Sequence, residues 1–120
     1  MPVPWLLLIT AMIAVETPNG ELVGDNGKAL GRLQIHKDCF EDAMEYAREQ
    51  DLDVSWIKYE HCKNYGVSVF VLRMYAARYK AKTPEEICKL WNGGPDWRTA
   101  KSKKKCNIKR YWLKVKKELK

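Results

Sequence analysis

The chain has 120 residues, of which 46% are hydrophobic and 31% are charged. These values are typical of one ordinary globular domain. A chain of this length can bury a sizeable hydrophobic core, so its fold does not need metal ions or crosslinks for stability. The formal net charge is +7, and residues 101–120 alone contain ten Lys or Arg and one Glu. This basic C-terminal region favours a polyanionic partner: nucleic acid, an anionic membrane or the acidic polymers of a bacterial wall.

The N-terminal stretch WLLLITAMIAV, residues 5–15, is strongly apolar. Its eleven residues are too few to span a bilayer. A secretion signal would need a Lys or Arg before the apolar run and a small-x-small cleavage site after it, and neither pattern is found. We therefore expect a buried first helix over residues 4–16, with the carboxyl group of Glu16 at its end.

Two Asn-Gly turns follow this helix, PNG at residues 18–20 and DNG at residues 25–27. Asn-Gly is a strong signal for a type I′ hairpin turn, because both residues accept a positive φ. The turns bracket ELV and precede ALGRLQI. Residues 20–35 are therefore predicted to form a small antiparallel hairpin or three-stranded sheet.

Helical patterns begin after the sheet. Asp38 and Glu41 form a capping box that predicts the start of a helix. The apolar face of this helix consists of Phe40, Ala43, Met44 and Ala47. Residues 60–80 are predicted to form a central helix, because apolar residues recur there at helical spacing. These are Val67, Phe70, Val71 and Met74.

Two more helices are predicted in the C-terminal third. Thr83 followed by Pro84 indicates a capped start, and the paired glycines of WNGGP, residues 91–95, end that helix in a turn. Asn107 is predicted to cap the last helix, whose apolar face consists of Ile108, Tyr111, Trp112, Val115 and Leu119. The fold class is therefore α+β, mostly helical, in a single domain of residues 1–120 with a small N-terminal antiparallel sheet.

The chain has four cysteines: Cys39, Cys62, Cys88 and Cys106. Their spacing contains no CxxC pair and matches no zinc site. An even number permits two disulfides in an oxidising compartment, and free buried thiols are the equal alternative.

Glu16 and Asp25 are the candidate chemical groups. Burial against an apolar helix disfavours the carboxylate form of Glu16 and raises its pKa, as a general acid near neutral pH requires. Asp25 lies in a polar Gly/Asn turn, where it is expected to stay ionised. A protonated acid and an ionised carboxylate across a cleft are the two groups that hydrolyse glycosidic bonds. Alternatively, Glu16 caps a helix or forms an ion pair and Asp25 makes an Asx-turn.

Five stretches in fixed order carry a resemblance: AVET (14–17), GDNGKALGRLQIH (24–36), YEHCKNYGVSVFVLRMYAARY (59–79), LWNGGP (90–95) and YWLKV (111–115). The chain resembles the invertebrate-type lysozymes together with their bacterial and phage-like relatives. The resemblance implies a lysozyme-like α+β fold. It also implies a glycoside hydrolase of the muramidase type, which cleaves the β-1,4 bond between N-acetylmuramic acid and N-acetylglucosamine in bacterial peptidoglycan.

The resemblance implies roles for individual residues. Glu16 looks like the general acid, and Asp25 like the partner carboxylate that acts as nucleophile or stabilises the oxocarbenium ion. The residues that would line the sugar cleft are Gln34, His36, Tyr75, Asn92, Gly93 and Gly94. For each of them a structural role in the core or in a turn is the competing interpretation. No metal ion or other cofactor is expected.

The chain also departs from the family. Thr17 and Pro18 replace the usual Ser-Gly after the acid, and Arg32 stands where many relatives have Pro. Four cysteines are few beside the secreted animal members, which favours a bacterial, phage or environmental relative. The resemblance implies a secreted protein, or a phage-type endolysin acting in the periplasm or at the cell wall. Its partners would be peptidoglycan and anionic wall polymers, with no specific nucleic acid and no transmembrane segment.

Two alternatives to a muramidase remain open. A lytic transglycosylase would use Glu16 alone and close a ring on the muramoyl sugar instead of admitting water. A non-enzymatic protein would use the C-terminal region as a cationic amphipathic helix that binds anionic membranes or nucleic acid. The apolar stripe of this helix is also compatible with docking onto the core.

Overall fold

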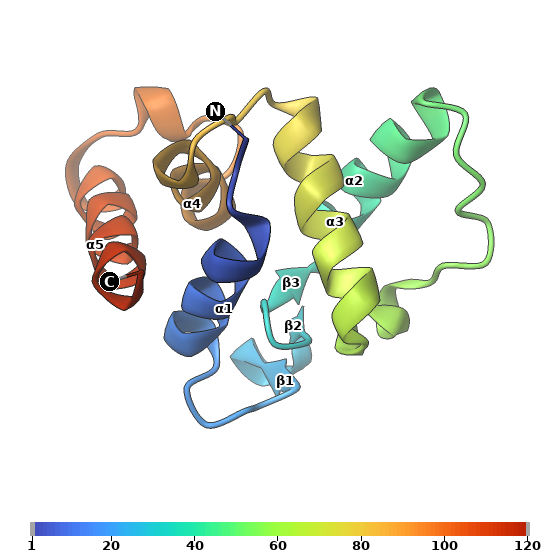
Figure 1. Ribbon diagram of the computed structural model, residues 1–120, viewed down its shortest axis with the longest axis horizontal. Helices are drawn as coiled ribbons and strands as arrows, with labels where there is room; N and C mark the ends of the chain where they lie inside the picture. The colour runs from blue at the N-terminus through green and yellow to red at the C-terminus, as the bar shows by residue number, and fades with distance from the viewer. Residues whose placement is uncertain (1, 120) are drawn as a thin grey trace.

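The computed structural model describes residues 2–119 (Figure 1). Within them the chain forms five α-helices and three short strands. The helices are α1 (Trp5–Glu16), α2 (Lys37–Glu49), α3 (Tyr65–Arg78), α4 (Pro84–Gly93) and α5 (Ser102–Glu118). The strands are β1 (Val23–Gly24), β2 (Ala29–Leu30) and β3 (Ile35–His36). The fold is therefore mostly helical with a small sheet, consistent with the predicted α+β class.

The strands form one antiparallel sheet in the order β1-β2-β3, which confirms the sheet predicted over residues 20–35. The DNG stretch joins β1 to β2 as a short 3₁₀ turn. Asp25 and Asn26 both have a positive φ there, of 51° and 57°. Asp and Asn are among the non-glycine residues that adopt this left-handed conformation most readily, so the turn suits its sequence.

Side-chain caps fix the starts of α3 and α4. The Thr83 hydroxyl accepts a hydrogen bond from the Glu86 N–H at 3.1 Å, which confirms the predicted start of α4. The Asn64 side chain accepts one from the Val67 N–H at 3.1 Å and so begins α3 at residue 65. The helix predicted over residues 60–80 is accordingly shorter, and a separate 3₁₀ turn precedes it.

Two predicted caps are wrong. Helix α2 begins at Lys37 without a side-chain cap, because His36 ends β3 and the helix starts at the next residue. Asp38 is therefore already helical. Asn107 lies inside α5, which begins at Ser102. The lysines before Asn107 are good helix formers, so the helix extends N-terminally past the expected cap.

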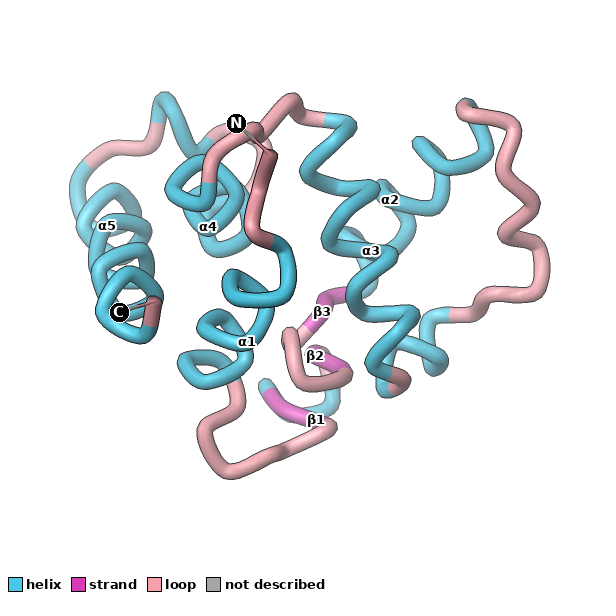
Figure 2. The backbone as a smooth tube through the Cα atoms, viewed as in Figure 1, coloured by secondary structure: helices cyan, strands magenta, loops and turns pink. Residues whose placement is uncertain are grey.

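Figure 1 shows α1 in the centre, with α4 and α5 on one side and α2 and α3 on the other. The most extensive packing is within the α2–α3 and α4–α5 pairs and between α1 and α5. One buried apolar cluster draws on all five helices and on the sheet. Figure 2 shows that a short loop carries the chain from the end of α1 to β1, so the sheet lies beside the residue that ends α1.

Helix α1 belongs to this core. Leu8 and Met12 are fully buried, but Leu6 and Leu7 are 71% and 65% exposed, so the prediction of a buried first helix holds for one face only. Helix α5 docks through Ile108, Tyr111 and Val115, which are all buried. Across the described range, residues 2–119, no helix combines the length and apolar character needed to cross a membrane.

Candidate active site

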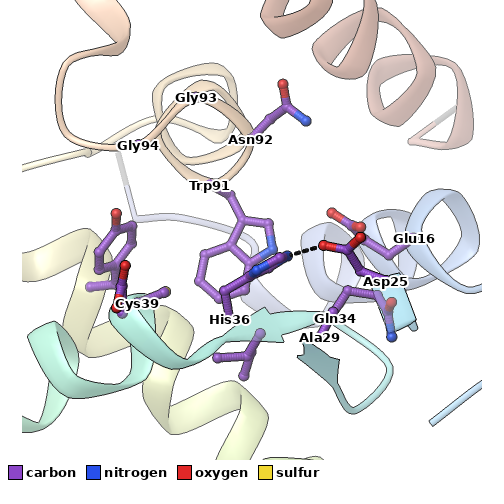
Figure 3. Close-up of a pocket in the computed structure, with 13 residues that line it drawn as sticks. Glu16, Asp25, Ala29, Gln34, His36, Cys39, Trp91, Asn92, Gly93 and Gly94 are labelled. Carbon is purple, nitrogen blue, oxygen red and sulfur yellow. Dashed lines mark ion pairs between the residues drawn. The ribbon is translucent and has the colours of Figure 1, made fainter. Parts of the chain in front are cut away.

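A cleft of about 500 Å³ lies between the end of α1, the sheet and the end of α4 (Figure 3). The structure brings all eight site residues predicted from the sequence into its lining: Glu16, Asp25, Gln34, His36, Tyr75, Asn92, Gly93 and Gly94. These residues come from segments up to 78 positions apart, so the fold, not local sequence, assembles the cleft. The roles of the individual side chains differ.

Glu16 ends α1 and is partly buried. Removal of its carboxyl group from water disfavours the charged form and raises the pKa of Glu16 to about 7. The Tyr111 hydroxyl opposes this shift, but its effect is the smaller of the two. A substantial fraction of Glu16 therefore remains protonated at neutral pH, and the cleft contains a carboxylic acid that can donate a proton.

Asp25 has the opposite surroundings. It begins the 3₁₀ turn after β1, and 58% of its side chain is exposed to solvent. Its carboxylate lies 3.5 Å from the Nε2 atom of His36 at the end of β3, the pair marked by a dashed line in Figure 3. The cleft thus holds two carboxyl groups in different environments.

Gln34 lies between β2 and β3, where its φ of 55° places it in a left-handed turn. Its Nε2 atom donates a hydrogen bond to the Gly31 carbonyl at 2.9 Å, which leaves its side-chain carbonyl oxygen as the group available to the cleft. That oxygen lies against Gly24, and a Cβ atom at this glycine would collide with it. The glycine in β1 therefore makes room for Gln34.

The WNGG stretch closes the cleft from the side of α4. Gly93 is buried against Ile108, whose side chain would collide with a Cβ atom there, so this glycine serves α4–α5 packing. Gly94 turns the chain out of the helix with a φ of 83°. Its N–H already donates to the Leu90 carbonyl at 2.8 Å, so it is not free for a sugar. Of the amides predicted here, the exposed Asn92 side chain is the one best placed to contact a ligand.

Trp91 was not among the predicted site residues, although its ring stands in the cleft (Figure 3). Its indole Nε1 donates to the Leu33 carbonyl at 3.1 Å and ties α4 to the sheet. The Tyr75 ring meets it edge-on with centroids 5.9 Å apart. Tyr75 is buried, so Trp91 is the more accessible aromatic surface. Its position next to the NGG turn was the signal that could have identified it.

Tyr111 was assigned from the sequence to the apolar face of the last helix, and it also faces Glu16. Its hydroxyl is buried without a hydrogen bond of regular geometry among the described residues, yet it is near enough to lower the pKa of Glu16. The Tyr111 hydroxyl and the Glu16 carboxyl group are therefore close neighbours. Burial and the charge of Glu16 together raise the pKa of Tyr111, so Tyr111 remains a donor.

The four cysteines, all within the described part of the chain, are free thiols in this structure. Cys39 lines the cleft, but burial raises the pKa of its thiol far above neutrality, so it is not an activated nucleophile. Cys88 is buried near Glu16, and desolvation raises the pKa of its thiol to about 12. Between residues 2 and 119, no group of three or more His, Cys, Asp or Glu side chains is arranged to hold a metal ion.

The cleft therefore combines a partly buried glutamic acid whose pKa is raised, a solvent-exposed aspartate, an aromatic ring and side-chain amides. These features come from the chain's own geometry and electrostatics. Comparison of the chain with protein-family models, with curated proteins and with solved structures finds no match.

Proposed function

We propose that the protein is a glycoside hydrolase of the muramidase type, which cleaves the β-1,4 bond between N-acetylmuramic acid and N-acetylglucosamine in bacterial peptidoglycan. The observation that carries this proposal is Glu16, a carboxyl group whose pKa is raised to about 7 inside a cleft of about 500 Å³. General acid catalysis is most efficient when the pKa of the acid lies near the working pH. The volume of the cleft also lies within the usual range of ligand-binding pockets and is large enough for a few sugar rings.

In this proposal Glu16 donates its proton to the oxygen of the glycosidic bond as that bond breaks. Asp25, exposed at the cleft wall, acts as nucleophile or stabilises the positive charge that develops on the sugar. His36 holds the Asp25 carboxylate in place from the end of β3. After cleavage Glu16 accepts a proton from the water that completes the reaction.

The other groups of the cleft suit a sugar ligand. Trp91 offers an aromatic face to the apolar side of a pyranose ring. The carbonyl oxygen of Gln34 and the side-chain amide of Asn92 can bind hydroxyl and N-acetyl groups. The order of elements also supports a lysozyme-like fold, with an acid at the end of a first helix and an aspartate in a small sheet. The same proposal places the protein at bacterial walls, with α5 drawn to their acidic polymers.

Lytic transglycosylase is the second candidate, and one observation favours it. Asp25 is exposed and engaged by His36, whereas Glu16 is partly buried and its pKa is raised to about 7. A transglycosylase needs only such a single acid, since the 6-hydroxyl of the muramoyl sugar replaces water as the attacking group. Mass spectrometry of digested peptidoglycan distinguishes the two reactions, because hydrolysis leaves reducing ends and transglycosylation leaves 1,6-anhydro ends.

A purely membrane-disrupting protein is less compatible with the structure. The apolar stripe of α5 is buried in the core through Ile108, Tyr111 and Val115 and is not free to enter a bilayer.

The deciding experiment compares purified peptidoglycan treated with the wild type and with Glu16→Gln. We expect soluble muropeptides with reducing ends from the wild type and almost none from the variant. No release of muropeptides by the wild type would refute the enzymatic proposal, and equal release by both proteins would show that Glu16 is not the acid.

A further inference from the structure

A second cavity opens on the far side of Glu16. It measures about 300 Å³ and is lined by Val15, Glu16, Asn92, Asn107, Arg110, Tyr111 and Lys114. Glu16 and Asn92 line both this cavity and the cleft described above. A ligand that spans Glu16 can therefore occupy the two cavities at once, with the acid between them. We call this second cavity the α5 subsite, because most of its lining comes from that helix.

The α5 subsite differs from the main cleft in charge. Arg110 and Lys114 are four residues apart on one face of α5, and both are exposed. Among residues 2–119, neither forms an ion pair within 4 Å. Glu16 is the one acid in the lining, and it is partly protonated at neutral pH. Two cations without partners thus face a cavity that adjoins the proton donor.

We propose that the α5 subsite binds a carboxylate of the peptidoglycan strand through Arg110 and Lys114. The carboxylate belongs either to the lactyl group of a muramic acid residue that carries no stem peptide or to the stem peptide itself. This inference rests on the proposed function and names the part of the substrate that the enzyme selects. A guanidinium group pairs with a carboxylate through two parallel hydrogen bonds, and a neighbouring ammonium group adds a third charge-assisted bond. A neutral β-1,4 glycan such as chitin carries no carboxylate. The subsite would therefore make the enzyme prefer muramic acid strands to neutral ones.

The same helix offers a matched control. Lys109 and Lys116 are seven residues apart and lie on the other flank of the buried stripe of α5, and neither lines the cavity. Lys109→Gln with Lys116→Gln removes two charges from α5, as does Arg110→Gln with Lys114→Gln. The two double variants thus separate binding in the subsite from general attraction between α5 and an acidic polymer.

The experiment measures kcat and KM on glycan strands stripped of their stem peptides. One half of the preparation keeps its lactyl carboxylates, and in the other half they are converted to neutral amides. We expect the wild type to have a KM about tenfold lower for the carboxylate strands, as one to two charge-assisted hydrogen bonds would supply. Arg110→Gln/Lys114→Gln should lose this preference and still cleave the amidated strands, whereas Lys109→Gln/Lys116→Gln should keep it.

In strands that retain their stem peptides the lactyl carboxyl group is already an amide, so amidation neutralises only the carboxylates of the stem. The same comparison on these strands therefore identifies the carboxylate. A preference seen with bare strands assigns it to the lactyl group, and one seen only with peptide-bearing strands assigns it to the stem. Arg110→Lys/Lys114→Arg keeps both charges and serves as a rescue variant that controls for folding, so it should retain the preference. The subsite is refuted if the wild type shows no preference for carboxylate strands in either set, bare or peptide-bearing, or if both Gln variants lose the preference alike. Absence of any cleavage by the wild type would instead refute the proposed function, and the subsite with it.

Discussion

The end of α1 and the turn after β1 each bring a carboxyl group to the same cleft, but they surround it differently. Glu16 follows an apolar helix, and its partial burial raises the pKa of its carboxyl group to about 7. Asp25 stands in a polar turn with 58% of its side chain in solvent and an imidazole 3.5 Å away. Two groups of the same chemical type thus lie in surroundings that differ in solvent exposure and in neighbouring groups.

This difference shows what a general acid requires from a fold. Glu16 is desolvated by its own helix and the core beneath it, whereas Asp25 is solvated because it lies in an exposed turn after β1. No single substitution would give Glu16 the surroundings of Asp25, or Asp25 those of Glu16. Substitutions at Glu16 and Asp25 should therefore differ in size, in pH dependence and in their effect on stability.

The largest effect is expected for Glu16→Gln, which keeps the shape of the side chain and removes its proton. Peptidoglycan cleavage should fall by roughly 10³-fold or more, within the range for a general acid that also assists bond breaking. The folded structure should remain, as far-ultraviolet circular dichroism can show. Turnover near the wild-type rate would mean that the acid has been assigned to the wrong residue.

Asp25→Asn should cause a smaller loss, of roughly 10²-fold in kcat with little change in KM, because the carboxylate acts mainly on charge that develops in the transition state. The measurement is initial rates on purified peptidoglycan, with the ends of the products identified by mass spectrometry. A variant with undiminished activity and 1,6-anhydro products would favour the transglycosylase reaction.

Glu16→Gln should also change stability, with a sign that depends on pH. Below the ordinary pKa of glutamate the carboxyl group is neutral in both states, and its burial costs little. As pH rises towards about 7, the unfolded chain ionises first, which lowers the free energy of unfolding by up to about 3 kcal/mol. The Gln variant avoids this loss. Urea unfolding should show it to be more stable than the wild type at about pH 8, with the advantage gone at about pH 4. An equal difference at both pH values would contradict the buried acid.

Tyr111→Phe should have the smallest effect. The Tyr111 hydroxyl lowers the pKa of Glu16, so its removal should raise that pKa further and shift the alkaline limb of kcat/KM to higher pH. The rate below neutrality should change only a few-fold. An alkaline limb that does not move, despite a folded variant, would show that the two groups are independent.

The sequence predicted more of the fold than of the details of the cleft. Local signals were sufficient for the sheet, because the DNG turn needs residues that accept a positive φ, and for the start of α4, because Thr83 caps it. Asn107 was misjudged because capping preference was weighed without the helix propensity of the lysines before it. Lys37 begins α2 because β3 ends at His36, a boundary set by strand pairing that no local pattern specifies.

The cleft itself mixes predictable and unpredictable residues. The position of Glu16 after an apolar run indicated burial, and the composition of the turn indicated the exposure of Asp25. Tyr111 could be placed on the apolar face of its helix, but its contact with Glu16 depends on the packing of α5 against α1, which lies outside any local pattern. The same holds for Arg110 and Lys114, which look like part of a uniform basic surface until the fold places them beside Glu16.

The most direct measurement is a pH titration of the Glu16 carboxyl carbon by ¹³C NMR on protein labelled in its glutamates. The resonance is assigned by its absence from the spectrum of Glu16→Gln. Because desolvation at the end of α1 holds the proton on this carboxyl group, we predict a titration midpoint at about 7. A midpoint at about 4.3, the value of an ordinary solvated glutamate, would show that Glu16 has already lost its proton at neutral pH and cannot be the acid.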